Sequence, residues 1–197
     1  MLRRLLPLIG LGRPGLSSAS ALCNVAESWL AQGVREDGSN RGDDVSWIIH
    51  DGGGNPDKAP PWCAYFVTSC CKAIERVGLP VRYVKTGRAV AHWQLSEEDQ
   101  RVDPRDVFAR DPRGLVFVRT RLSRPLTDTE RAIRGQRVQG HTGIVIGVEG
   151  DALRCVSGNS QGDRGHDAGS GAVCVETLRP SSPQWARLVG FVRVCPP

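Results

Sequence analysis

The hydrophobic period of this chain changes near residue 111, and that change restricts the possible folds more than any other feature. Before it, apolar residues recur at the spacing of amphipathic helices. After it, apolar and polar residues alternate, as they do in half-buried strands. Helices followed by strands, rather than alternating with them, indicate an α+β fold with N-terminal helices packed on one antiparallel sheet.

The local patterns place the individual elements. Pro60 and Pro61 open the clearest helix, because a proline's missing N–H has no partner in a first turn, and Gly78 ends it. Residues 34–61 are polar and read as a long loop with one helical turn. The expected helices are 19–33, 62–77 and 87–95, and the expected strands are 115–118, 141–148, 152–157, 172–178 and 188–194.

Length and composition fit one folded unit. The chain has 197 residues, of which 40% are hydrophobic and 24% charged, which excludes a wholly disordered chain and a polytopic membrane protein. We expect a single domain over residues 19–197, with an arginine-rich insertion at about 119–139 that forms a lid or a flexible loop. Residues 1–18 hold a short apolar stretch after two arginines, but they lack a clear cleavage site and are expected to be an N-terminal extension.

The net charge of +5 is spread along the chain rather than gathered in one run. Nucleic-acid-binding surfaces concentrate basic and aromatic residues on one face, so we expect no nucleic-acid partner. No apolar run approaches the length of a membrane span. The expected state is a monomer.

Seven cysteines make an odd count with no metal-binding spacing, so at least one thiol stays free and no structural metal is expected. Cys63 falls in the first turn of the helix predicted after Pro61. The helix dipole and the unpaired N–H groups there favour a thiolate and can bind an oxyanion. Cys70 and Cys71 lie about two turns deeper and are expected to be structural.

His141 begins a strand and is the preferred partner for Cys63, with His50 as its main competitor. If Glu149–Asp151 forms a three-residue turn, paired positions sum to 300, and His141 lies opposite Asn159. The Asn159 amide would then orient the imidazole. The predicted constellation is a Cys63 nucleophile, a His141 base and an Asn159 orienter.

The sequence resembles the CHAP amidase/peptidase family, which belongs to the NlpC/P60-like, papain-like cysteine hydrolases. The resemblance runs over about residues 22–194, and its parts follow the family's order. They are Glu36 with Asn40-Arg41-Gly42, Trp62-Cys63-Ala64-Tyr65-Phe66-Val67, Gly140-His141-Thr142-Gly143-Ile144-Val145, Gly158-Asn159 and Gly190-Phe191-Val192-Arg193.

The resemblance implies a papain-like fold and hydrolysis of a peptidoglycan amide bond, either between muramic acid and L-alanine or within the stem or cross-bridge peptide. It assigns catalysis to Cys63, His141 and Asn159, and it places Trp62, Asn40 and Ser157 as supporting or substrate-binding residues. Many relatives carry a glutamate where this chain has Ser157.

Some relatives from phages bind calcium near the cysteine, but the oxygen-bearing Asp51, Asn55 and Asp57 do not reproduce that spacing, so no cofactor is expected. A peptidoglycan hydrolase would be secreted or delivered to the cell wall, as a phage lysin, an autolysin or an antibacterial toxin. Two alternatives stay open. One is a papain-like hydrolase acting on a protein or small amide, and the other is a non-catalytic cell-wall-binding module.

Overall fold

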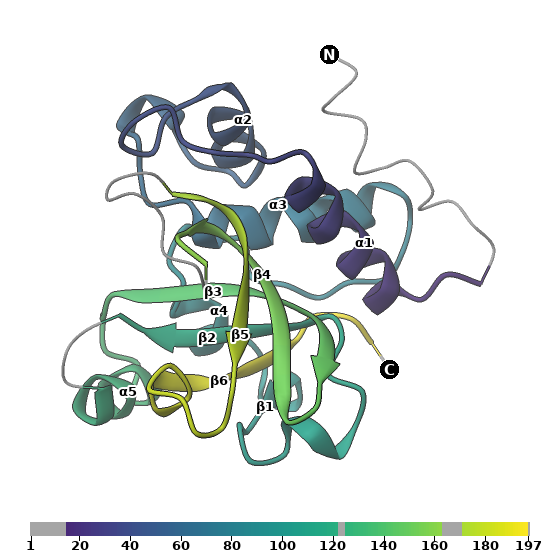
Figure 1. Ribbon diagram of the computed structural model, residues 1–197, viewed down its shortest axis with the longest axis vertical. Helices are drawn as coiled ribbons and strands as arrows, with labels where there is room; N and C mark the ends of the chain where they lie inside the picture. Colours follow the sequence, from purple (N-terminus) through teal and green to yellow (C-terminus); the bar gives the residue numbers. More distant parts are fainter. Residues whose placement is uncertain (1–14, 122–124, 163–170, 197) are drawn as a thin grey trace.

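The computed structural model describes residues 15–121, 125–162 and 171–196, with the side chains of 125–128 left aside. In this part of the chain, four helices precede the strands of an antiparallel sheet and a fifth lies between two of those strands (Figure 1), so the predicted α+β class is confirmed. The helices are α1 (Ser18–Ala31), α2 (Asp43–Asp51), α3 (Cys63–Arg76), α4 (Ala91–Gln94) and α5 (Pro125–Ile133). The strands are β1 (Arg101–Val102), β2 (Leu115–Thr120), β3 (Gly140–Glu149), β4 (Ala152–Ser160), β5 (Ala172–Leu178) and β6 (Leu188–Arg193).

Helix α2 lies where one helical turn was expected inside a loop. It is nine residues long and buries Val45, Ile48 and Ile49, which follow one another at helical spacing. Asp43 and Asp44 stand in its first turn, where negative charge stabilises the helix dipole. Glycines and acidic residues surround this short amphipathic pattern, so the segment is polar overall and its helix was not recognised from the sequence.

The described strands form one sheet in the order β1-β6-β2-β3-β4-β5, with every neighbouring pair antiparallel. The sheet bends strongly, so that β4 and β5 cross in front of β2 and β6 in Figure 1. A buried cluster inside this bend joins both ends of the sheet. It includes Phe117, Val145, Leu153, Leu178 and Phe191.

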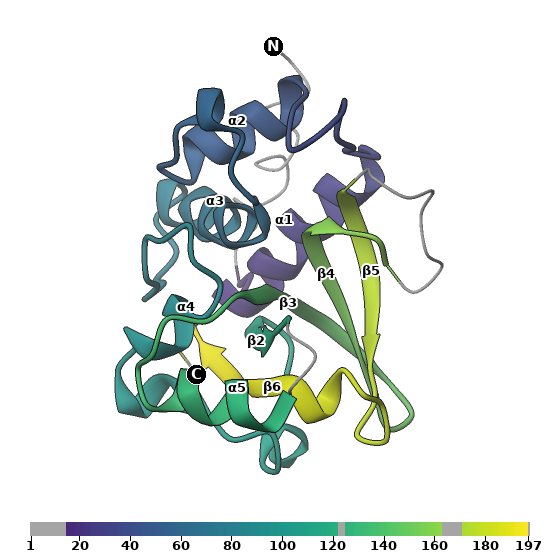
Figure 2. The same ribbon diagram turned by 90° about the vertical axis from the view of Figure 1, so that its left-hand side faces the viewer.

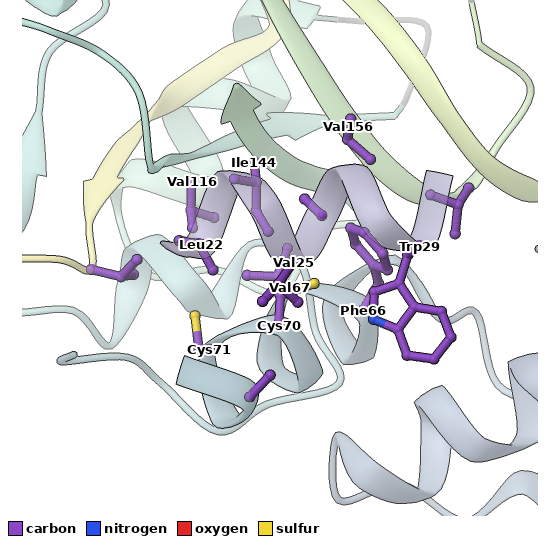
Figure 3. Close-up of a cluster of buried hydrophobic side chains, with 14 of the residues drawn as sticks. Leu22, Val25, Trp29, Phe66, Val67, Cys70, Cys71, Val116, Ile144 and Val156 are labelled. Carbon is purple, nitrogen blue, oxygen red and sulfur yellow. The ribbon is translucent and has the colours of Figure 1, made fainter. Parts of the chain in front are cut away.

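A second and larger core lies between the sheet and the helices. Figures 1 and 2 show α1, α2 and α3 gathered on one side of the sheet. Alternation along β3 explains how the sheet supports two cores, because Ile144 and Ile146 face the helices while Val145 enters the bend. The close-up in Figure 3 shows the central layer of the larger core, formed by Leu22, Val25 and Trp29 from α1, Phe66, Val67, Cys70 and Cys71 from α3, and Val116, Ile144 and Val156 from the sheet.

The β3–β4 hairpin differs from the predicted turn but regains the predicted register. Glu149 pairs with Ala152, so the turn holds two residues instead of three. An irregularity between Val145 and Gly147 then adds one residue to β3, as a β-bulge does. Beyond it, Ile144 pairs with Val156, which is the register that a three-residue turn would give.

The insertion at 119–139 was expected to be a lid or a flexible loop, but it contains α5. The Gln94 side chain ties this helix to the fold by donating to the carbonyls of Ala132 and Gln136 at 3.0 and 2.8 Å. Residues 122–124, and residues 1–14 of the predicted N-terminal extension, lie outside the described part. Among the helices described here, none is long and apolar enough to cross a membrane.

Candidate active site

Cys63 is the first residue of α3 and so lies in the first helical turn, where the sequence predicted it. The preceding Trp62 is fully buried, and its indole Nε1 donates to Glu36 Oε1 at 2.7 Å. Gly158 approaches the same indole so closely that a Cβ there would stand 2.4 Å from it. No side chain caps the helix, so the backbone N–H groups of its first turn can still donate hydrogen bonds to another acceptor. The start of α3 is therefore fixed in place, with the thiol in its first turn.

His141 lies at the start of β3, buried and tilted against the Phe117 ring. Its Nε2 is 2.6 Å from Oε1 of Glu176, a buried residue of β5. Burial alone would lower the pKa of His141, but the negative charge of Glu176 and the hydrogen bond with Cys63 outweigh it and raise the pKa. The imidazole is therefore held by a carboxylate at Nε2, and the Cys63 thiol is close enough to help raise its pKa.

Glu176 is buried together with enough partners to stay ionised. Arg119 donates to its Oε2 at 2.5 Å, and the hydroxyl groups of Ser157 and Ser160 donate to its Oε1. Burial raises the pKa of a carboxyl group, but His141, Arg119 and Ser157 together bring that of Glu176 well below its ordinary value. The site thus contains a fixed carboxylate behind the imidazole.

The Cys63 thiol is buried, and burial by itself raises a thiol pKa. Its hydrogen bond to His141 and the positive charges of His141 and Arg121 reverse this effect, so the pKa of Cys63 is lowered. The pKa values of Cys70 and Cys71, on the same helix, are raised well above the ordinary value by burial. Among these three helix cysteines, only Cys63 has surroundings that favour a thiolate.

The expectation that Asn159 orients His141 is wrong in this structure, because Glu176 takes that position. Asn159 has a φ of 53°, and the β4–β5 ladder is irregular between Ser157 and Ser160. This left-handed residue interrupts the alternation of faces that the register argument assumed, and its side chain leaves the face of the sheet that holds the imidazole.

The Asn159 side chain instead lies beside the start of α3. Its amide nitrogen donates to Asn40 Oδ1 at 3.1 Å. With the amide turned the other way, it donates to Glu36 Oε1 at 3.2 Å and accepts from the backbone N–H of Trp62 at 3.1 Å. Asn40 in turn donates to the Ala59 carbonyl at 3.0 Å. Asn159 and Asn40 therefore support the loop that precedes Cys63, and Ser157 supports Glu176.

The sequence analysis did not identify three charged residues of the site, which are Glu176, Arg119 and Arg121. A signal for Glu176 does exist in the strand AVCVETL, where this acid shares a strand face with Cys174 and Leu178. A carboxylate on a face that also carries a core leucine needs a buried partner. Arg119 and Arg121 belong to an arginine-rich stretch in which nothing in the sequence marks these two.

The other histidines lie apart from this arrangement. His92 is buried in α4, and burial lowers its pKa to about 4, with only a hydrogen bond to the Ala64 backbone opposing the shift. His50, the predicted competitor, is exposed in the last turn of α2. His166 lies outside the described residues.

A polar cavity of about 610 Å³ opens beside the His141 ring. Its walls come from the loop between α1 and α2, the ends of β2 and β4, the start of β3 and the second half of β5, and they include Glu36, Asn40, Arg121, His141 and Asn159. Chain segments that are distant in the sequence thus meet at a hollow next to the imidazole, which is the usual place for a small-molecule or substrate site.

The residues that the sequence suggested for calcium are engaged elsewhere. The Asp51 carboxylate accepts from Ser69 at 2.6 Å and pairs with Arg76, while the Asn55 side chain accepts from the backbone of Asp57 at 2.9 Å. Within the described ranges, no group of three or more His, Cys, Asp or Glu residues is arranged to hold a metal ion.

Comparisons with known proteins add nothing to the evidence from this geometry. No protein-family model, no curated protein and no solved structure matches the chain.

Proposed function

We propose that this protein is a cysteine hydrolase that cleaves an amide bond of peptidoglycan. One observation carries the proposal: His141, whose proximity helps to lower the pKa of the Cys63 thiol at the start of α3, has its Nε2 held 2.6 Å from the buried carboxylate of Glu176. A nucleophile, a base and a group that orients the base are the parts that amide hydrolysis through an acyl-enzyme needs. Glu176 replaces Asn159 as the third member of the predicted constellation.

In the proposed reaction, the Cys63 thiol gives its proton to His141, and the thiolate attacks the carbonyl carbon of the scissile amide. First-turn N–H groups of α3 stabilise the oxyanion that forms. The C–N bond breaks as His141 returns the proton to the leaving amine, and a thioester remains. Water activated by His141 then attacks the thioester and releases the acid together with the regenerated thiol. Glu176 keeps the ring oriented and stabilises its protonated form throughout.

The substrate class rests on the CHAP-like motifs around Cys63 and His141 and on their order in the chain. An N-terminal helix that presents a cysteine to a histidine on an antiparallel sheet is also the arrangement of papain-like enzymes, and we assign the fold to that group as part of the proposal. The scissile bond is either the muramoyl–L-alanine amide or a peptide bond of the stem or cross-bridge. Such a substrate requires delivery of the protein to a cell wall.

Mass spectrometry of purified peptidoglycan after digestion tests this proposal, because each new amino terminus identifies the bond that was cut. The wild type is expected to release soluble fragments, while Cys63→Ser releases none and Cys70→Ser behaves like the wild type. Absence of fragments with the wild type, combined with cleavage of a protein substrate that depends on Cys63, would replace peptidoglycan by protein as the substrate class.

A further inference from the structure

Arg121 lines the candidate site and has no carboxylate partner among the described residues. Its guanidinium lies 3.3 Å from Nδ1 of His141 and 3.2 Å from the carbonyl oxygen of Asn159. The side chain is exposed and lines the cavity beside the imidazole. Among the ion pairs of the described residues, none includes Arg121.

The neighbouring charges of the cavity are already engaged. Arg119 is paired with Glu176, which also accepts from Ser157 and Ser160. Glu36 accepts from the Trp62 indole at 2.7 Å. Among the described residues that line the cavity, Arg121 is therefore the charged group still available to an anionic ligand. A guanidinium suits a carboxylate in particular, because its parallel N–H groups match the two oxygens.

The contact with His141 indicates when Arg121 becomes available. Nε2 of the ring faces the Glu176 carboxylate, so the neutral imidazole carries its proton there and presents a lone pair at Nδ1. Arg121 can only donate, so it satisfies Nδ1 while the ring is neutral. When the thiol proton moves to Nδ1, the ring and the guanidinium are both cations and repel each other. A hydrogen bond to an anion is then more favourable for Arg121 than its contact with the ring.

We propose that Arg121 binds a carboxylate of the substrate beside the scissile amide, and so makes this site selective for acidic over amidated substrates. The inference deepens the proposed function by naming the chemical group that the site recognises. Stem peptides of peptidoglycan offer such a group, because their acidic residues occur either as free carboxylates or as carboxamides. A substrate carboxylate would also draw Arg121 away from Nδ1 and leave that nitrogen to the Cys63 proton.

The first test needs no hydrolysis and uses two alkylating reagents of nearly equal size. The Cys63 thiolate displaces iodide from either iodoacetate or iodoacetamide, and only iodoacetate carries a carboxylate. Any effect of Arg121 on the thiolate itself changes both rates alike, so their ratio isolates recognition of the carboxylate. Mass spectrometry quantifies the adduct at Cys63 and separates it from adducts at other cysteines.

We expect Arg121→Gln to lower the iodoacetate-to-iodoacetamide rate ratio at Cys63 at least about tenfold, as loss of a charge-assisted hydrogen bond implies. Arg121→Lys keeps the charge and should retain part of the ratio. The matched control is Arg35→Gln, which removes the same charge from an exposed residue of the adjacent pocket and should leave the ratio within about twofold. An unchanged ratio in Arg121→Gln, or an equal fall in Arg35→Gln, would overturn the proposal.

The second test uses paired stem-peptide substrates that differ only in a free carboxylate or a carboxamide next to the scissile bond. Arg121→Gln should raise KM for the acid by about tenfold or more while changing the amide much less. Equal losses on both substrates would assign Arg121 to the thiolate alone and overturn carboxylate binding. If the wild type cleaves neither peptide nor peptidoglycan, yet the alkylation ratio depends on Arg121, the proposed function fails and the carboxylate site stands.

Discussion

The first turn of α3 and the middle of the same helix both bury cysteines, but the pKa values of these thiols move in opposite directions. Burial raises the pKa of Cys70 and Cys71, which face the apolar core. Cys63 is buried as well, yet its hydrogen bond to His141 and two nearby positive charges lower its pKa. The difference teaches that the direction of a buried thiol's pKa shift in this helix is set by its partners at the helix start and not by exposure.

Two buried histidines repeat the comparison for the base. The exposed fraction of His141 and of His92 is 2% in each case. The pKa of His141 is raised by Glu176 and Cys63, whereas burial lowers that of His92 to about 4 because only the Ala64 backbone bonds to its ring. The carboxylate of Glu176 therefore accounts for the difference: it raises the pKa of His141, the candidate base, whereas the His92 imidazole stays neutral.

The largest expected effect is on the nucleophile. Cys63→Ser should reduce turnover of peptidoglycan by about 10⁴-fold or more, because a neutral hydroxyl replaces a thiol that is poised to ionise. Release of soluble fragments measures the loss, and circular dichroism checks that the fold is kept. Turnover within tenfold of the wild type would show that Cys63 is not the nucleophile. The proposed contrast between a reactive thiol at the start of α3 and structural thiols in its middle would then be wrong.

The next effect separates Glu176 from Asn159. Glu176→Gln removes the charge that raises the His141 pKa, and turnover should fall by roughly 10⁴-fold, as it does when an orienting carboxylate is lost. Asn159→Ala removes a support of the loop before α3 and should cost about tenfold.

The pH profile tells the two roles apart. Glu176→Gln should shift the acid-side pKa of the pH–rate profile downward, since the imidazole loses its carboxylate, whereas Asn159→Ala should leave it in place. Retained stability must be verified for Glu176→Gln, because Arg119 loses its charged partner. A larger loss in Asn159→Ala than in Glu176→Gln would restore the assignment made from the sequence.

His92 gives a prediction for stability against pH. Its folded pKa of about 4 lies below the ordinary 6.5, so between these values the unfolded chain binds more protons and stability falls as the pH falls. The shift corresponds to about 3 kcal/mol. Urea unfolding at pH 7 and pH 4 should show this loss in the wild type beyond the loss in His92→Gln, which cannot titrate there. Equal losses in both proteins would mean that His92 is protonated in the fold.

The change from helices to strands, and the positions of Cys63 at a helix start and His141 at a strand start, could be predicted from the sequence, because helix starts and strand alternation are local patterns. Asn159 as the orienter could not, since that prediction carried strand alternation past Ser157. A left-handed residue ended the alternation there, and the actual partner came from a strand farther along the chain. The same limit applies to Arg121, because its place beside the imidazole follows from the pairing of β2 with β3.

The smallest expected effect is on the structural cysteine and reverses the pattern of Cys63. Cys70→Ser puts a hydroxyl group into the apolar core and should cost about 1–3 kcal/mol of unfolding free energy, while turnover at saturating substrate stays within about twofold. Cys63→Ser places the same hydroxyl beside His141, which can accept its hydrogen bond, so its cost in stability should be smaller. Denaturant unfolding of the two variants side by side measures both costs. If Cys63→Ser proved the less stable of the two, the first turn of α3 would be held together by its thiol, and its loss of turnover would no longer report on chemistry alone.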